Sequence, residues 1–199
     1  MSRQFTGVIL IIAMVLMVPL HGFAATPMEA VKTGVDKVLA TLTDPAFKAK
    51  SKDQQLVQLT DAINTIFDFE ELSKRTLGRE WKKMTDAQQK EFVQLFRELL
   101  QGVYADRLLA YSDQKVIFDK ENMLKKGQAE VQSYLQTADG KKIPLFYRLT
   151  DKSGSWKVYD VIIEGVSMVK NYRTQFREIL AKDSPEKLLE ILRDKTSKS

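Results

Sequence analysis

The sequence contains no cysteine, and its single histidine, His21, lies near the start of the chain. Without cysteine the protein can form no disulfide and offers no thiol nucleophile. The chain after His21 contains no histidine, so it lacks the commonest general base and a frequent transition-metal ligand. Glycine-rich phosphate loops and dinucleotide-binding fingerprints are missing as well. These absences argue against a metal site and most enzyme classes, and they leave carboxylates as the remaining acid–base groups.

Residues 1–24 have the pattern of a secretory signal peptide. Arg3 is the one charged residue before Glu29, an apolar run covers residues 8–18, and small residues precede a cleavage position after Ala24. An uncleaved anchor is the alternative, but the run is short for a span of roughly 20 residues. We expect cleavage after Ala24 and one domain over residues 25–199. An exported chain without disulfides indicates the periplasm of a Gram-negative bacterium.

The charge balance is mildly positive. Removing residues 1–24 takes away one basic residue and no acidic one, so the formal net charge falls from +5 to +4. Basic and acidic residues are interleaved through both halves, as on a solvated surface, and no aromatic-rich RNA-binding strand occurs. Nucleic-acid binding is therefore not expected. The positive excess suits approach to anionic lipid surfaces and acidic partners.

Helical periodicity dominates the first half of the mature chain. Apolar residues recur at helical spacing over residues 28–42 and again over residues 56–67. Thr85 and Gln88 form a capping box that opens the longest expected helix, Asp86–Tyr111. The N-terminal half is therefore expected to consist of helices that lead into one long central helix.

After the long helix, the helical period gives way to the alternation of apolar and polar residues that is typical of β-strands. Asp139-Gly140 predicts a two-residue hairpin turn, and Pro144 indicates a sheet edge or a bulge. Helix returns after Gly165, and Ser184 caps a last helix with Pro185 at its first position. Strands are expected over residues 116–118, 129–135, 143–149 and 156–163. The expected fold class is α+β, with an antiparallel meander of about four strands between N-terminal and C-terminal helices.

The strand over residues 156–163 is apolar on both faces, so both faces must be covered. One face can rest on the long helix. The other can rest on the remaining helices or form the wall of a cavity, and composition alone favours a filled core. Simple alternation predicts one face with Trp156, Val158 and Ile162, and the other with Tyr159, Val161 and Ile163.

Carboxylates form two clusters along the chain. Paired carboxylates can perform glycoside hydrolysis. Asp68, Glu70 and Glu71 instead suit the start of a helix, where acidic side chains favour the helix dipole. Asp160 and Glu164 flank a strand-to-helix junction, where they would pair with cations or cap backbone donors. The structural interpretation is preferred for both clusters, and a hydrolase using Asp160 and Glu164 stays open as an alternative.

A specific resemblance starts from the junction segment Trp156-Lys157-Val158-Tyr159-Asp160-Val161-Ile162-Ile163-Glu164-Gly165-Val166-Ser167. Further matching residues are Phe69-Glu70-Glu71-Leu72, Leu77-Gly78, Trp81 through Thr85, Phe92, Phe96-Arg97, Leu100, Tyr104, Asn171-Tyr172-Arg173 and Phe176. In this order and after a signal peptide, these residues resemble the Mla-pathway periplasmic phospholipid-binding proteins, also called the toluene-tolerance family. The resemblance covers most of residues 67–180.

The resemblance implies a soluble phospholipid carrier without catalysis or cofactor, in which the bound phospholipid is the cargo. Its acyl chains would lie in an apolar cavity between sheet and helices. A monomer would exchange lipid with an outer-membrane lipoprotein complex and with an inner-membrane ABC-transporter complex that has a lipid-binding ring subunit. Such exchange would maintain the lipid asymmetry of the outer membrane. A solid-core adaptor of the cell envelope is a further alternative.

Carried over by matching position, the resemblance also implies site residues. The pocket mouth is expected at Tyr104, Glu164, Gly165, Val166 and Ser167. The pocket wall is expected at Leu108, Val158, Val161, Ile163 and Val169. Ordinary core packing remains the alternative for every wall residue.

Overall fold

The structure is a computed structural model that describes residues 25–112, 114–152 and 154–197. The expected signal peptide lies outside these residues. Within the described ranges, no helix is long and apolar enough to cross a membrane. The elements run in the order α1 (Pro27–Thr43), α2 (Pro45–Lys48), α3 (Lys52–Asn64), α4 (Phe69–Leu77), η1 (Glu80–Lys83), α5 (Asp86–Leu109), β1 (Lys115–Lys125), β2 (Gln128–Gln136), β3 (Lys142–Lys152), β4 (Ser155–Ile163), β5 (Val166–Ser167), α6 (Met168–Leu180) and α7 (Pro185–Thr196). The α+β prediction is confirmed.

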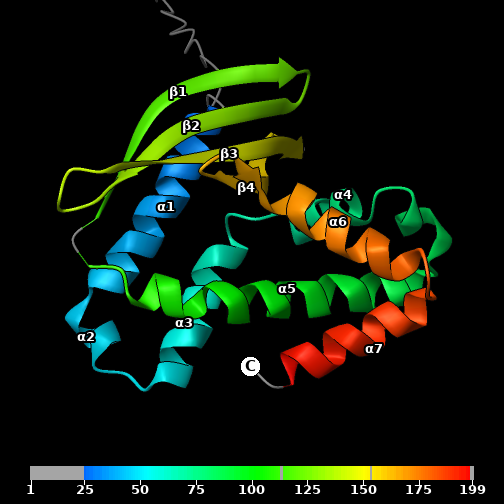
Figure 1. Ribbon diagram of the computed structural model, residues 1–199. Coiled ribbons are helices and arrows are strands. Elements are labelled where there is room, and N and C mark those ends of the chain that lie inside the picture. Colours follow the sequence, from blue (N-terminus) through cyan, green and yellow to red (C-terminus); the bar gives the residue numbers. More distant parts are fainter. Residues whose placement is uncertain (1–24, 113, 153, 198–199) are drawn as a thin grey trace, which may run out of the picture.

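The helices and the sheet form separate layers. In Figure 1 the sheet arches over α5, and α1 runs from the sheet down towards α2 and α3. Helices α4, α6 and α7 lie at the other end of α5. Helix α5 packs mainly against α7 and α4, whereas α1 lies against β1, β2 and β4. The expectation that the long helix covers the sheet therefore holds only for its C-terminal end, where Leu108 and Leu109 reach the hydrophobic cluster beneath the strands.

Local sequence signals set the ends of the helices. Thr85 accepts a hydrogen bond from the backbone N–H of Gln88, which completes the expected capping box of α5. Asp68 caps α4 in the same way, and Glu70 and Glu71 occupy its first turn, as expected for acidic residues at a helix start. Ser184 caps α7. These signals placed the helix starts correctly because capping depends on a few neighbouring residues.

The sheet is a five-stranded antiparallel meander in the order β1-β2-β3-β4-β5. The predicted two-residue hairpin turn is wrong. Gly140 donates to the Thr137 carbonyl at 2.9 Å, and Thr137 donates to the Lys141 carbonyl at 3.0 Å. The loop therefore contains three residues, and Gly140 adopts a φ of 83° at its end. Glycine is favoured there because the three-residue hairpin loop needs a left-handed residue.

The interpretation of Pro144 as an edge or bulge residue is also wrong. Pro144 pairs with Tyr134 in β3, which is an interior strand. The β3–β4 pairing begins one residue later, at Leu145 and Ile163, and the Pro144 carbonyl accepts from the Glu164 N–H at 3.0 Å. Proline is tolerated at this position because it lies at the end of the paired ladder with β4.

A bulge in β4 changes which residues share a face. Arg148 pairs with Asp160, but Leu149 pairs with Val158, so Tyr159 is an extra residue. Val158 and Val161 consequently face the same side of the sheet. Simple alternation had placed them on opposite faces, and that prediction is wrong because one inserted residue reverses the phase of the strand. The face that carries Val158 and Val161 is called the inner face below.

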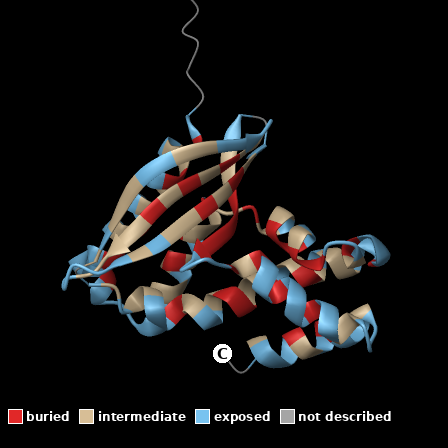
Figure 2. Ribbon diagram, turned by 45° about the horizontal axis from the view of Figure 1, so that its top comes forward, coloured by how far each residue is buried: buried red, intermediate tan, exposed pale blue. Residues whose placement is uncertain are grey.

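The buried side chains form two hydrophobic clusters. The helical cluster lies among α4, α5, α6 and α7, and the sheet cluster lies among the inner face, α1 and α3. Phe67 and Met168 are partly buried against both clusters. Figure 2 shows buried segments along the middle strands and along the facing sides of the helices. The interior is therefore divided into two clusters that meet at Phe67 and Met168.

Candidate functional site

The helical cluster is densely filled by aromatic rings. Phe96 lies between Tyr172 and Phe176, at ring-centroid distances of 5.0 and 5.2 Å, and Phe92 meets Phe176 edge-on at 5.5 Å. Burial raises the pKa of the Tyr172 phenol, and the neighbouring Tyr104 adds to the shift. Tyr104 therefore lies at the border of a closed core, on the side of α5 that approaches α6.

The side chains on the inner face become more exposed to solvent along β4. Val158 is fully buried, Val161 is 7% exposed and Ile163 is 36% exposed. Their β3 neighbours follow the same trend, since Leu149 is fully buried and Leu145 is only half-buried. The side chains of the inner face are therefore fully covered at Val158 and partly exposed where β4 turns into β5, and this partly exposed end is called the open end below.

Apolar side chains from several elements surround the sheet cluster without being fully enclosed themselves. Those contributed by the strands, by the end of α5 and by the start of α6 are Phe118, Leu145, Trp156, Leu108, Leu109, Tyr111 and Met168. Phe118 stacks on Tyr147 across the inner face at 6.3 Å. The helical cluster is also flanked by partly buried apolar side chains, so what distinguishes the sheet cluster is the graded exposure along β4.

The turn between β4 and β5 stands at the open end. Ile163 pairs with Val166, and the two central residues, Glu164 and Gly165, have φ values of 50° and 83°. Positive φ at both central positions is the requirement of a type I′ hairpin turn. Glu164 is the one non-glycine residue with positive φ among the described residues. Such backbone strain persists where the surrounding structure enforces it, and Val166 is held outward with 61% exposure.

A buried carboxylate fixes this turn to the following helix. Asp160 is 2% exposed. One of its oxygens accepts from the Ser167 hydroxyl at 2.7 Å and the other accepts from the Val169 N–H at 3.0 Å. Arg148 lies 3.9 Å away and pairs with Glu130 at 3.0 Å. Both oxygens of Asp160 are thus occupied by the junction itself, as the structural interpretation expected.

The structure distributes the predicted site residues over both clusters. Val158, Val161 and Leu108 belong to or pack against the sheet cluster. Val169 and Tyr104 belong to or pack against the helical cluster. The predicted mouth residues 164–166 are exposed, whereas Ser167 is buried on Asp160. The structure brings Ile163, the turn and the start of α6 together, and the assigned roles remain predictions.

Sequence reasoning missed several residues of the open end. Leu145 lies opposite Ile163 in the register of β3 and β4, and Phe118 reaches the inner face from β1. Met168 contacts both clusters directly after Ser167. The hairpin register could have revealed Leu145, since the partner of a predicted wall residue shares its face. Phe118 lies in the expected strand 116–118, but the side of the sheet that it faces follows from the pairing of β1 with β2, which periodicity does not provide.

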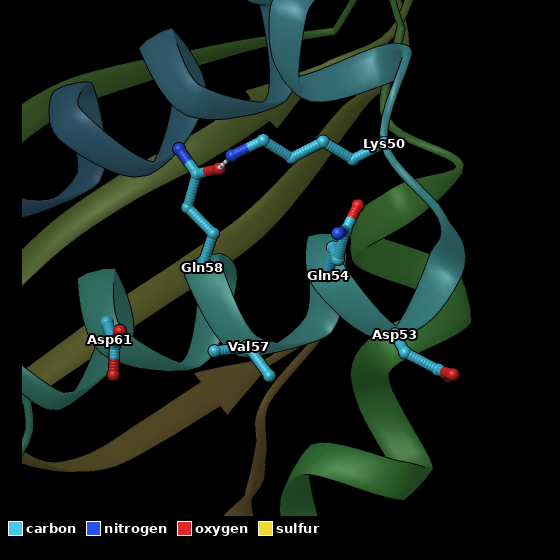
Figure 3. A pocket seen from close by; sticks show the side chains of 6 residues that line it. All are labelled: Lys50, Asp53, Gln54, Val57, Gln58 and Asp61. Carbon is cyan, nitrogen blue, oxygen red and sulfur yellow. Dashed lines mark hydrogen bonds between the residues drawn. The ribbon is translucent and has the colours of Figure 1, made fainter.

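Two surface grooves lie away from this open end. One, of about 450 Å³, follows α3. Figure 3 shows Lys50 reaching Gln58 beside the exposed Val57, and the two polar groups are 2.6 Å apart. The other, of about 380 Å³, runs between α1 and the start of β4 and reaches Val158. Neither groove is lined by residues of the β4–β5 turn.

The structure is that of an α+β protein whose inner sheet face is partly exposed at the end where β4 turns into β5. The family model described as MlaC protein matches residues 32–194. The chain belongs to the MlaC family. The resemblance seen in the sequence is therefore confirmed.

Individual relatives agree with this assignment. The intermembrane phospholipid transport system binding protein MlaC of Haemophilus influenzae is 26% identical over 177 residues, which cover 86% of this chain and 83% of the relative. The toluene tolerance protein ttg2D of Pseudomonas putida is 27% identical over 165 residues, covering 80% and 75%. A solved structure of a Ralstonia solanacearum phospholipid-binding protein in complex with a phospholipid matches with a TM-score of 0.79 and 29% identity, covering 87% and 98%.

Proposed function

We propose that the protein is a soluble periplasmic carrier that shuttles phospholipid between the outer and inner membranes and so maintains outer-membrane lipid asymmetry. The observation that carries the proposal is the thinning cover of the inner face, from a fully buried Val158 to a 36% exposed Ile163. A relative of the same fold is described in complex with a phospholipid. An apolar sheet face that is partly exposed at one end would suit a ligand that has long apolar chains.

The energetics of acyl chains explain why enclosure matters. Two chains with about 30 methylenes would cost on the order of 25 kcal/mol in water, at roughly 0.8 kcal/mol per methylene. Contact with a surface patch would leave much of that area wet. Transfer from a bilayer into an apolar interior is nearly neutral by comparison, because both environments resemble hydrocarbon. A carrier of this kind therefore needs no nucleotide of its own.

The proposed arrangement places the acyl chains along the inner face. Leu108, Val158, Val161 and Ile163 form the proposed wall on this face, whereas Val169, the fifth predicted wall residue, belongs to the helical cluster. Val158 and Val161 are so well buried that their contribution is to the closed end, and Ile163 would contact lipid near the opening. This assignment follows the increase in exposure from Val158 to Ile163.

The head group would stay at the mouth, near Tyr104 and residues 164–167. The exposed turn carries Glu164 and Val166 at the open end of the inner face. The buried Ser167 would act by holding the turn through Asp160. The exposed turn and the hydrogen bond between Ser167 and Asp160 would together keep the opening in place while lipid enters and leaves.

The proposed carrier has neither catalysis nor a cofactor. Asp160, the best candidate acid of the hydrolase alternative, is 2% exposed and uses both carboxylate oxygens within the β4–α6 junction. As a monomer, the carrier would exchange lipid with an outer-membrane lipoprotein complex and with an inner-membrane ABC-transporter complex through its lipid-binding ring subunit. The direction of transport would come from these partners.

Organic extraction and mass spectrometry of protein purified from the periplasm test the proposal. We expect roughly one phospholipid per chain, because one interior with one open end would hold one pair of acyl chains. A lipid-free protein that hydrolyses glycosides would favour the hydrolase. A lipid-free protein without activity would favour the solid-core adaptor.

A further inference from the structure

Helix α6 presents a basic face to solvent. Lys170, Arg173 and Arg177 recur at helical spacing, and all three are exposed. Glu178 is the single acidic residue of this helix. Among the described residues, no ion pair involves any of the three cations. Among the other described residues, some exposed cations have carboxylate partners, such as Lys32 and Lys187, and some have no ion pair, such as Lys37 and Lys48.

Arg173, the middle cation of this face, is held by hydrogen bonds within the protein itself. Arg173 donates from Nε to the backbone carbonyl of Arg75 at 3.0 Å, and one terminal nitrogen donates to the same oxygen. The other terminal nitrogen remains available on the exposed side chain. Lys74, the neighbour of Arg75 on α4, is exposed and adds positive charge beside it. A pre-ordered guanidinium loses little side-chain entropy on binding.

An exposed apolar tip precedes the basic face in the chain. Ile163 and Val166 are cross-strand partners with 36% and 61% exposure, and Val166 comes four residues before Lys170. The Asp160–Ser167 contact ties the turn to the start of α6, since the Ser167 hydroxyl also accepts from the Lys170 N–H at 3.1 Å. These hydrogen bonds join the tip and the start of the basic face into one structural unit.

We propose that this unit, made of Ile163, Val166, Lys170, Arg173 and Arg177, docks onto an acidic protein surface that surrounds the lipid opening of a membrane partner. The inference rests on the proposed carrier function and deepens it by assigning the partner-binding surface and its chemistry. Carboxylates would meet the basic face, and the apolar tip would meet the apolar rim of the partner's opening. Docking in this way brings the open end of the inner face next to the lipid's source or destination.

The composition of the surface favours an acidic protein over an anionic bilayer. Two of the three cations are arginines, whose planar guanidinium pairs bidentately with carboxylates and phosphates alike, so the distinction rests on the tip. The tip offers two aliphatic side chains and no aromatic one, whereas interfacial membrane anchors commonly use tryptophan, phenylalanine or leucine. Charge complementarity of this kind mainly accelerates association and selects the partner.

A double charge reversal, K170E/R177E, tests the proposal on the full-length mature protein. The matched control is K37E/K48E, which reverses two exposed lysines on α1 and α2 and changes the net charge equally. Binding is measured by biolayer interferometry to the purified ring domain of the inner-membrane transporter and to the outer-membrane lipoprotein complex. Flotation with vesicles of phosphatidylethanolamine and phosphatidylglycerol measures binding to an anionic bilayer.

We expect K170E/R177E to weaken binding to at least one of the two protein partners by about tenfold or more at low salt, with a smaller difference at high salt. The control should bind within about threefold of the unaltered protein. Equal loss in both variants, or no loss in either, would overturn the proposal. Loss of vesicle binding with intact protein binding would assign the surface to the bilayer and overturn it as well.

Measuring the lipid content distinguishes a failure of the docking proposal from a failure of the carrier function. Both variants should retain the same phospholipid per chain by mass spectrometry, because the reversed side chains are exposed and lie outside the proposed wall. Loss of docking with retained lipid supports the inference. An unaltered protein without lipid would contradict the carrier function and remove the basis of the docking proposal, whatever the binding result.

Discussion

Ser167 donates a hydrogen bond from its hydroxyl to the buried carboxylate of Asp160 at 2.7 Å, and this contact joins the end of the sheet to the start of α6. The same hydroxyl caps α6 by accepting from the Lys170 N–H, while Asp160 also accepts from the Val169 N–H. One buried acid thus accepts from two donors at the start of α6 and fixes the exposed turn at residues 164–165. The position of the proposed mouth depends on this pair.

Replacing Asp160 by alanine should destabilise the protein strongly. The change leaves the Ser167 hydroxyl and the Val169 N–H without their acceptor and removes a carboxylate near Arg148. We expect the free energy of unfolding to fall by about 3 kcal/mol, measured by urea denaturation. Asp119→Ala, at an exposed position of β1, should change it by less than about 0.5 kcal/mol. Equal stability of both variants would show that the buried network is not needed.

Val166→Glu should block lipid loading without unfolding the protein. Val166 is 61% exposed, so the charge remains hydrated, but it would stand at the opening through which acyl chains pass. Val57→Glu is a matched control, because Val57 is 64% exposed on α3 and away from the turn. Mass spectrometry should find phospholipid in the control and little in Val166→Glu, with similar circular dichroism. Unchanged lipid occupancy in Val166→Glu would rule out a role at the mouth.

Truncating two residues of β4 should separate packing from lipid binding. Val158→Ala removes methyl groups from a fully buried site and should lower the free energy of unfolding by about 2 kcal/mol. Ile163→Ala, at a site with 36% exposure, should cost about 1 kcal/mol or less in the lipid-free protein. We expect Ile163→Ala to lose lipid faster in a chase with empty vesicles. If Ile163→Ala matched the unaltered protein in lipid loss, Ile163 would not contact the cargo.

Alkaline pH should destabilise the protein through a buried tyrosine. Burial raises the pKa of Tyr147 far above its ordinary value. The neutral phenol is therefore favoured in the folded state, and this contribution is complete below about pH 10 and is lost as the pH rises above it, by up to about 1.4 kcal/mol per pH unit. Tyr147→Phe keeps the ring that stacks on Phe118 and should show a shallower decline in urea titrations above pH 10. Identical slopes would contradict this assignment.

Crowding at Gly34 should make α1 intolerant of a side chain. A Cβ atom placed there would lie 2.5 Å from Cγ1 of Ile66, so the isoleucine would have to move. We expect Gly34→Ala to lower the melting temperature, with a cost of about 1–3 kcal/mol from overpacking. An increase in melting temperature, as helix propensity alone predicts for Gly→Ala, would show that Ile66 adapts freely.

Local signals predicted the helices well, whereas the sheet needed information about its partners. Thr85 and Asp68 reveal helix starts because each cap depends on side chains a few residues away. The full extent of β1, Lys115–Lys125, was missed because its second half is rich in charged residues and is held by pairing with β2. Strand length here follows from tertiary pairing, which periodicity along one chain does not contain.

The candidate site was harder to predict for the same reason. The bulge at Tyr159 places Val158 and Val161 on one face, and nothing in the alternation of residues indicates it. Met168 and Phe118 approach the open end only after α6 and β1 are placed in the fold. The junction residues 156–167 were found because they resemble a family motif, and their physical order became clear only from the register of the strands.

The most direct test of the carrier is whether acyl chains lie inside the protein. A phospholipid with a pyrene-labelled acyl chain is loaded onto the lipid-free protein, and iodide quenching is compared between the protein-bound lipid and the same lipid adsorbed on a surface. The account predicts binding of one lipid per chain, with iodide quenching lower by about tenfold than for lipid adsorbed on a surface, because an enclosed chain is shielded from aqueous ions. Failure to load, or quenching as strong as for surface-adsorbed lipid, would contradict it.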